Sequence, residues 1–324
     1  MPKRMMKPLP LTLSSRQRRK LIQQFGVLSA WPISLLAAEE KALSFAFIGD
    51  LPYSTLEEGS LSRMYQSFPK TLAFAVHIGD IKSGTESCSD TLITRRMDLI
   101  QKCPVPLILL PGDNEWVDCS RSFAGSHDPI ERLAFWRQLY LRDQRASAAL
   151  SLSRQINWPE NLQWRHTATR ASFVSLNVPG SFDAMVNSVQ GTTHRRSRNI
   201  ANAEWLALAA NKARAEQDKF LLIFIHANTH LDTGLAQPQS SGGSKLAYAP
   251  FKQALAQALE QFPGHVTVFY GDTHQFRIEY PWEEQFGRRL LAVQCYGSPF
   301  TGAWLRVDLD AKHSEPHISP QAIP

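Results

Sequence analysis

The stretch Phe74-Ala75-Val76-His77-Ile78-Gly79-Asp80 decides the fold prediction for this chain. Its apolar residues are typical of a buried strand, and the strand ends in a glycine followed by a carboxylate. Three other apolar segments end in the same way, at Gly49-Asp50, Gly112-Asp113 and Gly271-Asp272. Glycine lets the chain turn sharply at such a point and approach a ligand closely. Four predicted strands therefore each end in a Gly-Asp turn.

Four carboxylates at the ends of strands predict a cation site. In an α/β sheet, functional groups gather at the carboxyl ends of the strands. Like charges brought together at that edge repel one another strongly unless cations lie between them. We therefore expect Asp50, Asp80, Asp113 and Asp272 to hold metal.

The remaining pattern alternates strands with helices. Strands are predicted at 43–48, 72–78, 105–110, 171–178, 220–225, 266–270, 290–296 and 304–309. Helices are predicted at 61–68, 90–101, 202–217 and 251–262, and another begins at Pro129. The alternation predicts an α/β fold, with a central mixed sheet or two packed sheets flanked by helices.

The other segments give weaker patterns. Residues 141–165 match neither the helical nor the strand periodicity. Residues 180–200 are expected to form a loop, and residues 232–245 are expected to form a flexible excursion. The Pro-rich residues 313–324 are expected to be a loose tail. No Gly-x-Gly-x-x-Gly follows a predicted strand, which excludes a dinucleotide-binding reading. A single domain over residues 39–312 is the resulting prediction.

The first 38 residues carry the basic charge of the chain. They hold seven basic residues and no acidic one, so the formal charge of +6 for the whole chain leaves −1 on residues 39–324. A nearly neutral domain gives no reason to expect a nucleic-acid partner.

These 38 residues are expected to be an export signal. Arg18-Arg19-Lys20-Leu21-Ile22 resembles a bacterial twin-arginine signal, and an uncharged stretch ending in small residues follows it. A disordered basic tail and a retained membrane anchor are the alternatives. Gln23, Gln24, Gly26 and Pro32 make a poor spanning helix, so no stable membrane insertion is expected after removal of the signal. The domain would then be periplasmic or extracellular.

The four cysteines are consistent with export. Cys88 and Cys119 each follow one of the Gly-Asp turns by a few residues, so we expect a disulfide between two loops at the same sheet edge. In the chain-entropy model this bond would contribute on the order of 3–4 kcal/mol. Cys103 and Cys295 lie beside or within predicted strands and are expected to be buried thiols.

The order of the strand-end motifs resembles that of the calcineurin-like metallophosphoesterases. That family carries Asp-x-His, Gly-Asp, Gly-Asn-His-Asp/Glu, a lone His after a strand, and Gly-His-x-His. The corresponding blocks here begin at Asp50, Gly79, Gly112, His226 and Gly271, each at the end of a predicted strand. The resemblance covers about residues 43–310. It implies a sandwich of two mixed β-sheets flanked by helices.

The resemblance also implies a dinuclear metal centre. Its ligands would all be strand-end residues: Asp50 and His274 for the first ion, Asp113, His226 and Asp272 for the second, and Asp80 bridging both. The implied activity is hydrolysis of a small phosphoester by a metal-bridging hydroxide, without a protein nucleophile. Asp80 and Asn114 are the residues expected to lie at the reacting group.

This sequence departs from the family pattern at three positions. Pro52 stands where the family has a ligating His, and Tyr53 beside it either takes that place or packs. Asn114 replaces a His that contacts phosphate, and Asn donates a hydrogen bond but cannot act as a general acid. Asp272 replaces another ligating His. The alternative prediction is therefore a degenerate relative that binds without turnover.

The implied ligand set is rich in oxygen. It has four carboxylates and two imidazoles, where the family typically has two carboxylates, an amide and four imidazoles. Such a set favours Mn, Fe, Mg or Ca over Zn. It also reduces Lewis acidity, so slower chemistry or a higher pH optimum is expected. His230 is either a further ligand or a surface-loop residue, and the sequence gives no substrate code.

Overall fold

The computed structural model describes residues 42–181, 188–233 and 247–324. The predicted export signal and most of the predicted 232–245 excursion lie outside these ranges. Within them, no helix has both the length and the apolar character needed to cross a membrane.

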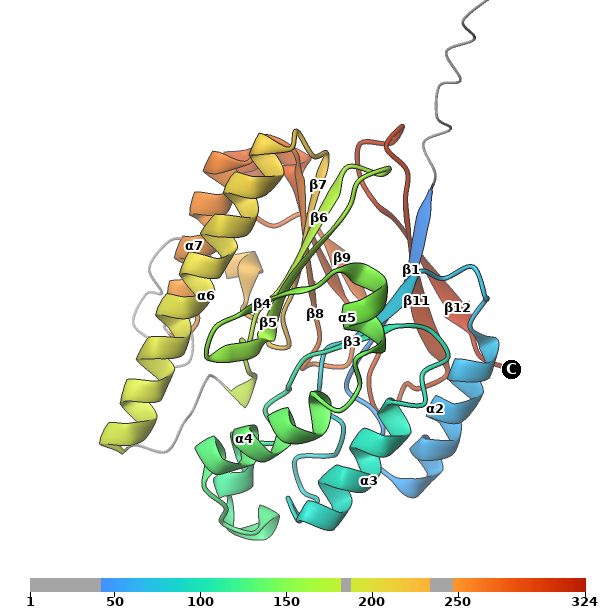
Figure 1. Ribbon diagram of the computed structural model, residues 1–324, viewed down its shortest axis with the longest axis vertical. Coiled ribbons are helices and arrows are strands. Elements are labelled where there is room, and N and C mark those ends of the chain that lie inside the picture. The colour runs from blue at the N-terminus through green and yellow to red at the C-terminus, as the bar shows by residue number, and fades with distance from the viewer. Residues whose placement is uncertain (1–41, 182–187, 234–246) are drawn as a thin grey trace, which may run out of the picture. The chain divides into compact units, whose positions relative to one another are not determined.

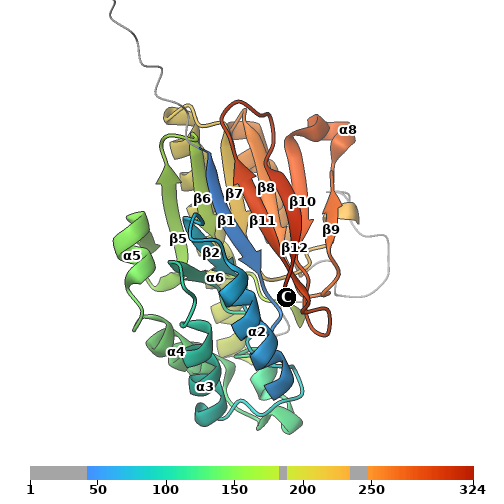
Figure 2. The ribbon, with the colours of Figure 1, turned by 90° about the vertical axis from the view of Figure 1, so that its right-hand side faces the viewer.

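One of the two sheets has five strands and contains the stretch that decided the fold prediction (Figure 2). Its strand order is β12 (His317–Ala322), β11 (Ala303–Leu309), β1 (Leu43–Ile48), β2 (Phe74–His77) and β3 (Leu107–Leu109). Strands β1, β2 and β3 are parallel, and β11 is antiparallel to both β1 and β12. The sheet is therefore mixed, and the three strands that end in Gly-Asp turns point the same way.

The other sheet has seven strands and is also mixed. Its order is β4 (Ser153–Gln155), β5 (Trp158–His166), β6 (Ala171–Ser175), β7 (Phe220–Phe224), β8 (His265–Tyr270), β10 (Leu290–Gln294) and β9 (Arg277–Glu279). The four central strands β6, β7, β8 and β10 are parallel, and the outer ones are antiparallel. The predicted fold class, two mixed sheets flanked by helices, is confirmed.

The two sheets pack face to face through aromatic side chains. Phe45 of β1 stacks on Phe74 of β2 at a ring distance of 4.8 Å, and it meets Phe224 of β7 edge to face at 5.9 Å. Side chains alternate along each strand, so Ala46 of β1 and Ile223 of β7 point to the opposite, outer faces. Each sheet therefore buries both faces, which explains the nearly continuous apolar runs in the sequence.

Helices cover both outer faces (Figure 1). The first sheet packs against α2 (Thr55–Ser67), α3 (Asp90–Ile100) and α4 (Pro129–Tyr140), and the second packs against α6 (Val189–Ala215) and α7 (Ala249–Gln261). The structure also contains two shorter helices, α5 (Arg145–Leu150) and α8 (Glu283–Phe286). The described residues from 42 onward fall in one compact unit.

Two helices are longer than the sequence predicted. Helix α2 begins at Thr55 because the Ser54 side chain accepts a hydrogen bond from the backbone of Glu57, a helix start that the Ser-x-x-Glu pattern encodes. Helix α6 begins at Val189, capped by Ser188, so the prediction of a loop over 180–200 was wrong from residue 189 onward. The basic residues at 195, 196 and 198 therefore lie on a helix.

The prediction of a loose tail at 313–324 was also wrong. Strand β12 pairs with β11 over its whole length, from Ala303 opposite Ala322 to Asp308 opposite His317. It is an edge strand, which tolerates Pro320 because only one side of the strand makes ladder hydrogen bonds.

The predicted disulfide is confirmed. Cys88 and Cys119 are bonded with a Cα–Cα distance of 5.6 Å, and both are buried. The bond joins the loop after β2 to the loop after β3, across 31 residues of sequence. Cys103 and Cys295 are free and buried, as expected.

Candidate metal centre

The predicted ligands lie where the carboxyl ends of the two sheets meet. Asp50 follows β1, Asp80 follows β2 and Asp113 follows β3, whereas His226 follows β7 and Asp272 follows β8. The His226 ring joins the sheets, because its Nδ1 lies 2.9 Å from the carbonyl oxygen of Ile78. The expectation of one shared edge therefore holds for both sheets.

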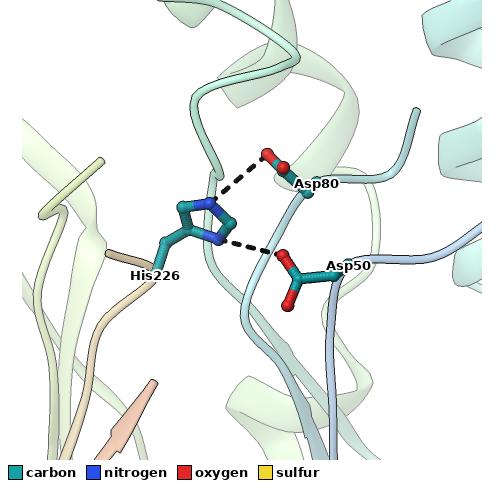
Figure 3. A group of neighbouring side chains, drawn as sticks. All are labelled: Asp50, Asp80 and His226. Atoms are coloured by element: carbon teal, nitrogen blue, oxygen red, sulfur yellow. Dashed lines mark ion pairs between the residues drawn. The ribbon is translucent and has the colours of Figure 1, made fainter. Parts of the chain in front are cut away.

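Two groups of side chains have the spacing of metal ligands. The first is Asp50, Asp80 and His226 (Figure 3), and the second is Asp113, His226 and Asp272. In each group the potential ligand atoms lie within 4.8 Å of one another. His226 therefore stands between two candidate ion positions, whereas the sequence placed it with the second ion only.

The orientation of His226 determines which nitrogen faces a metal. With Nδ1 donating to the Ile78 carbonyl, Nε2 is the nitrogen that faces the carboxylates. Nε2 lies 2.9 Å from Asp113 Oδ1 and 3.5 Å from Asp80 Oδ1, whereas Asp50 Oδ1 is 4.0 Å from Nδ1. His226 Nε2 is therefore nearer to Asp113, a member of the second group, than to Asp80 of the first.

His274 lies at the Asp50 side of the centre. Its Nδ1 is 2.5 Å from the carbonyl oxygen of Ser298, and its Nε2 is 3.9 Å from Asp50 Oδ1. A backbone carbonyl on one ring nitrogen fixes the ring with the other nitrogen toward the site, a common arrangement for ligating histidines. Its position is compatible with the predicted role at the first ion, although it belongs to neither group above.

Tyr53 and Asn114 both contact Asp80. The Tyr53 hydroxyl donates to Asp80 Oδ2 at 2.8 Å and lies 3.2 Å from His274 Nε2. Asn114 Nδ2 donates to the same Oδ2 at 2.5 Å, and the Asn114 backbone N–H donates to Oδ1 at 3.0 Å. Burial, followed by the charges of Asp80 and Asp50, raises the pKa of Tyr53 well above 10. Tyr53 is therefore a site residue and a neutral hydrogen-bond donor.

Glu115 supports the turns that carry the carboxylates. Its Oε1 accepts from the backbone N–H of Gly112 at 2.7 Å and from that of Asp80 at 3.2 Å. Trp116 beside it is fully buried. One side chain therefore ties the second and third Gly-Asp turns together.

The charges at the centre are unbalanced without a cation. Burial raises the pKa of Asp50 and of Asp80, and it raises the pKa of Asp272 to about 6. Burial alone would lower the pKa of His226, yet the neighbouring carboxylates, Asp80 first, raise it well above 6.5. Burial also opposes ionisation of Asp113, but the hydrogen bond and charge of His226 lower its pKa. One imidazolium thus faces four carboxyl groups.

Glycines let the backbone pass close to the carboxylate oxygens of the centre. A Cβ added at Gly180 would lie 2.4 Å from Asp113 Oδ1 and 2.7 Å from Asp272 Oδ1, and one at Gly112 would lie 2.0 Å from Asp80 Oδ1. Asp80 and Asp272 themselves adopt positive φ angles of 57° and 73°. Non-glycine residues in this region are strained and cluster at functional sites. The buried carboxylates, the fixed imidazoles and this spacing fit divalent cations.

Metal binding should depend on pH in a direction that these pKa shifts set. A carboxyl group whose folded pKa is raised, such as Asp272 at about 6 against 3.8, holds a proton in the metal-free protein below that pH. Protons and metal compete for the same groups, so the affinity for metal rises with pH. We expect the rise in unfolding temperature caused by Mn²⁺, relative to chelator at the same pH, to be larger at pH 7.5 than at pH 5.5.

The comparison at equal pH removes the contribution of the other buried groups. His77 and His265 have pKa values lowered to about 4 by burial, so they destabilise the fold as the pH falls from 6.5 toward 4, with or without metal. An equal or larger effect of Mn²⁺ at pH 5.5 would contradict carboxylate ligation.

The other residues considered from the sequence lie outside the two groups. His230 is in neither of them, and its backbone N–H donates to the Asn228 side chain. His77 is fully buried, and its Nε2 lies 2.9 Å from the carbonyl oxygen of Leu51, so it is a residue of the core. Lys82 is buried with its Nζ on the carbonyl oxygen of Ser83, so it does not face a substrate.

Two contacts of the ligands were missed by the sequence analysis. The Ser181 hydroxyl donates to Asp113 Oδ2 at 2.6 Å, and the backbone N–H of Asn228 donates to Asp272 Oδ2 at 3.1 Å. The sequence contains a signal for the Ser181 contact, because Pro179-Gly180 forms one more turn after a predicted strand. Arg121, which donates to Ser181 Oγ at 3.0 Å, had no such signal.

Comparison with solved structures places the fold. The chain is similar to a dimetal phosphatase from Danio rerio, with a TM-score of 0.54 and 13% identity over 87% of this chain and 96% of that one. It is also matched by GAP50, the anchor in the inner membrane complex of Plasmodium (TM-score 0.48, 13% identity, 87% and 89% covered). A third match is Haemophilus influenzae NAD nucleotidase (TM-score 0.43, 10% identity, 87% of this chain and 50% of that one).

The first of these matches shows the fold and nothing finer. At 13% identity, the similarity to the dimetal phosphatase shows a shared two-sheet architecture. We draw nothing from the other two, whose TM-scores lie below 0.5. No family model matches the chain, and no curated protein matches it in sequence.

Proposed function

We propose that this protein is a metal-dependent phosphoester hydrolase. The observation that carries the proposal is the pair of carboxylate–imidazole groups that share His226 at the meeting edge of the two sheets. The fold shared with a dimetal phosphatase supports it. Two divalent ions held there would supply Lewis acidity and an acidified water, the chemistry that hydrolyses phosphoesters without a protein nucleophile.

The residues of the chain would divide the work as follows. Asp50 and His274 would hold the first ion, Asp113, His226 and Asp272 would hold the second, and Asp80 would contribute to both. Tyr53 and Asn114 fix the Asp80 carboxylate by hydrogen bonds to its Oδ2. Neither an amide nor a phenol whose pKa lies well above 10 gives up a proton readily near neutral pH. The leaving group would therefore depart without a strong general acid from these two side chains.

The substrate would be a small phosphoester. The oxygen-rich ligand set favours Mn, Fe, Mg or Ca over Zn. We also propose that residues 1–38 direct export, which the Cys88–Cys119 disulfide supports because such bonds persist in oxidising compartments. N-terminal sequencing of the mature protein tests this, and a first residue at Met1 would refute cleavage at residue 38.

A binding module without turnover is the second candidate. Asn114 stands where the related enzymes have a histidine, and both its backbone N–H and its side chain are bonded to Asp80. Its side-chain amide also lies 3.2 Å from the Tyr53 hydroxyl. A site with its donors committed in this way could bind a phosphate group and yet fail to hydrolyse it.

The two candidates differ in their response to chelation. We expect the purified protein to hydrolyse p-nitrophenyl phosphate or bis(p-nitrophenyl) phosphate, to lose at least about 90% of this activity in EDTA, and to recover it on addition of Mn²⁺, because catalysis requires the metal. Activity that survives exhaustive chelation would contradict the proposal. The absence of turnover with Mn²⁺, Fe²⁺, Mg²⁺ or Ca²⁺ would favour the binding module.

A further inference from the structure

The metal centre needs a source of positive charge beyond its ions. Four carboxylates formally balance the charge of two divalent cations, so the centre would attract an anionic substrate only weakly. A cation supplied by the protein at the rim would restore the attraction. Lys82 cannot be that cation, because it is buried and bonded to the carbonyl oxygen of Ser83.

Arg121 is a half-exposed cation at this rim. Its Nη2 donates to Ser181 Oγ at 3.0 Å, and the same hydroxyl donates to Asp113 Oδ2 at 2.6 Å. Only one hydroxyl therefore separates the guanidinium from a predicted ligand of the second ion. Its Nη1 lies on the Asn114 side, because a Cβ added at Gly84 would be 3.5 Å from Nη1 and 2.8 Å from Asn114 Oδ1.

The guanidinium is held in place and yet accessible. Asp118, whose side chain is 5% exposed, holds Nη1 at 2.6 Å, while the Arg121 side chain remains 43% exposed. These two contacts use two of the five N–H groups of an arginine, which leaves others for a ligand. A planar fork of this kind matches the oxygens of a phosphate group.

The loop that carries Arg121 is fixed at both sides. Cys119, two residues before it, is bonded to Cys88, and the backbone N–H of Cys88 donates to the carbonyl oxygen of Ala124 at 2.8 Å. The backbone N–H of Arg121 donates to the carbonyl oxygen of Asp118 at 3.0 Å. The disulfide and these hydrogen bonds therefore hold the backbone on both sides of Arg121.

We propose that Arg121 binds the phosphoryl group of the substrate at the metal centre and favours phosphomonoesters over phosphodiesters. A monoester presents a dianionic terminal phosphate, and a fork beside the ions can bond two of its oxygens. A diester carries a single negative charge, so it gains less from the guanidinium. The inference rests on the proposed function, because it assigns a substrate class to the same site.

The test uses two variants of Arg121 and one matched control. Arg121→Gln keeps an amide donor for Ser181 but removes the charge, and Arg121→Lys keeps the charge but removes the fork. The control is Arg95→Gln on α3, another half-exposed arginine, which pairs with Glu58 away from the centre. The probe is inorganic phosphate, added to the Mn²⁺-loaded protein and followed by calorimetry, with metal content measured in each variant.

We expect Arg121→Gln to weaken phosphate binding roughly 10- to 100-fold, as loss of a charge-assisted hydrogen bond does. The metal content of Arg121→Gln should equal that of the wild type, and Arg95→Gln should bind phosphate as the wild type does. The phosphate affinity of Arg121→Lys should lie between those of the wild type and Arg121→Gln. In turnover, KM should rise more than kcat, and kcat/KM for p-nitrophenyl phosphate should fall more than for bis(p-nitrophenyl) phosphate.

Either of two results would overturn the inference. One is phosphate binding by Arg121→Gln that equals wild type, and the other is a metal-loaded wild type that binds no phosphate. Failure of the proposed function gives a different outcome. A protein whose phosphate binding depends on Arg121 but that hydrolyses no ester would refute the hydrolase and keep the phosphate site.

Discussion

Replacement of Asp80 by Asn is expected to reduce phosphoester hydrolysis by roughly a thousandfold. Asp80 belongs to the first ligand group, and its Oδ1 lies 3.5 Å from Nε2 of His226, which the two groups share. Metal ions stabilise a phosphoryl-transfer transition state by several kcal/mol, and each 1.36 kcal/mol is a factor of ten in rate. An amide carries no charge to hold two ions together, so the loss should appear in kcat at every metal concentration.

The matched control for this variant is Asp98→Asn. Asp98 is an exposed acid on α3 and lies outside both metal groups. Its replacement removes the same charge without touching the centre, so activity should remain within about twofold of wild type, as expected for a surface substitution. Asp80→Asn activity within tenfold of wild type would place the reaction elsewhere in the molecule.

Addition of one methyl group at Gly180 should disable the second ion position. The new Cβ would lie 2.4 Å from Asp113 Oδ1 and 2.7 Å from Asp272 Oδ1, closer than two such atoms can approach. Both carboxylates would have to move, although neither has been replaced. We expect Gly180→Ala to keep the fold, to lose one of two bound ions, and to lose at least about a hundredfold in kcat, since misplaced ligands cost that much.

Gly302→Ala is the control for the added methyl group. A Cβ at Gly302 would have no atom within 4 Å, so this variant should retain both ions and full activity. Metal content by mass spectrometry and initial rates on the same preparations decide the prediction. Wild-type metal content in Gly180→Ala would mean that Asp113 and Asp272 do not share an ion.

The sequence predicted the strands that are buried on both faces. Strands β1, β2, β7 and β8 are mostly apolar, and a glycine or a histidine follows each of them within two residues, so both signals are local. Strand β12 has no such signal, because it is an edge strand made of exposed and half-buried residues and contains Pro320. Its place depends on pairing with β11, which a single sequence does not show.

The sequence predicted those residues of the site that stand directly after strands. The four Gly-Asp carboxylates and His226 come together because parallel strands deliver them to one edge. The contacts of Tyr53 with Asp80 and His274 bridge 27 and 221 residues of sequence, and the second of them depends on how the two sheets pack. The same holds for Ser181 and Arg121, whose loops meet only in the folded chain.

The metal content of the purified wild-type protein tests the central claim most directly. We predict about two divalent ions per chain after incubation with Mn²⁺ and removal of excess metal, and their loss on dialysis against chelator. The carboxylates that accumulate without a balancing charge at the meeting edge of the sheets require this result. A folded protein that holds no ion after incubation with Mn²⁺ or Fe²⁺ would contradict the account, and the shared fold would then carry no metal chemistry.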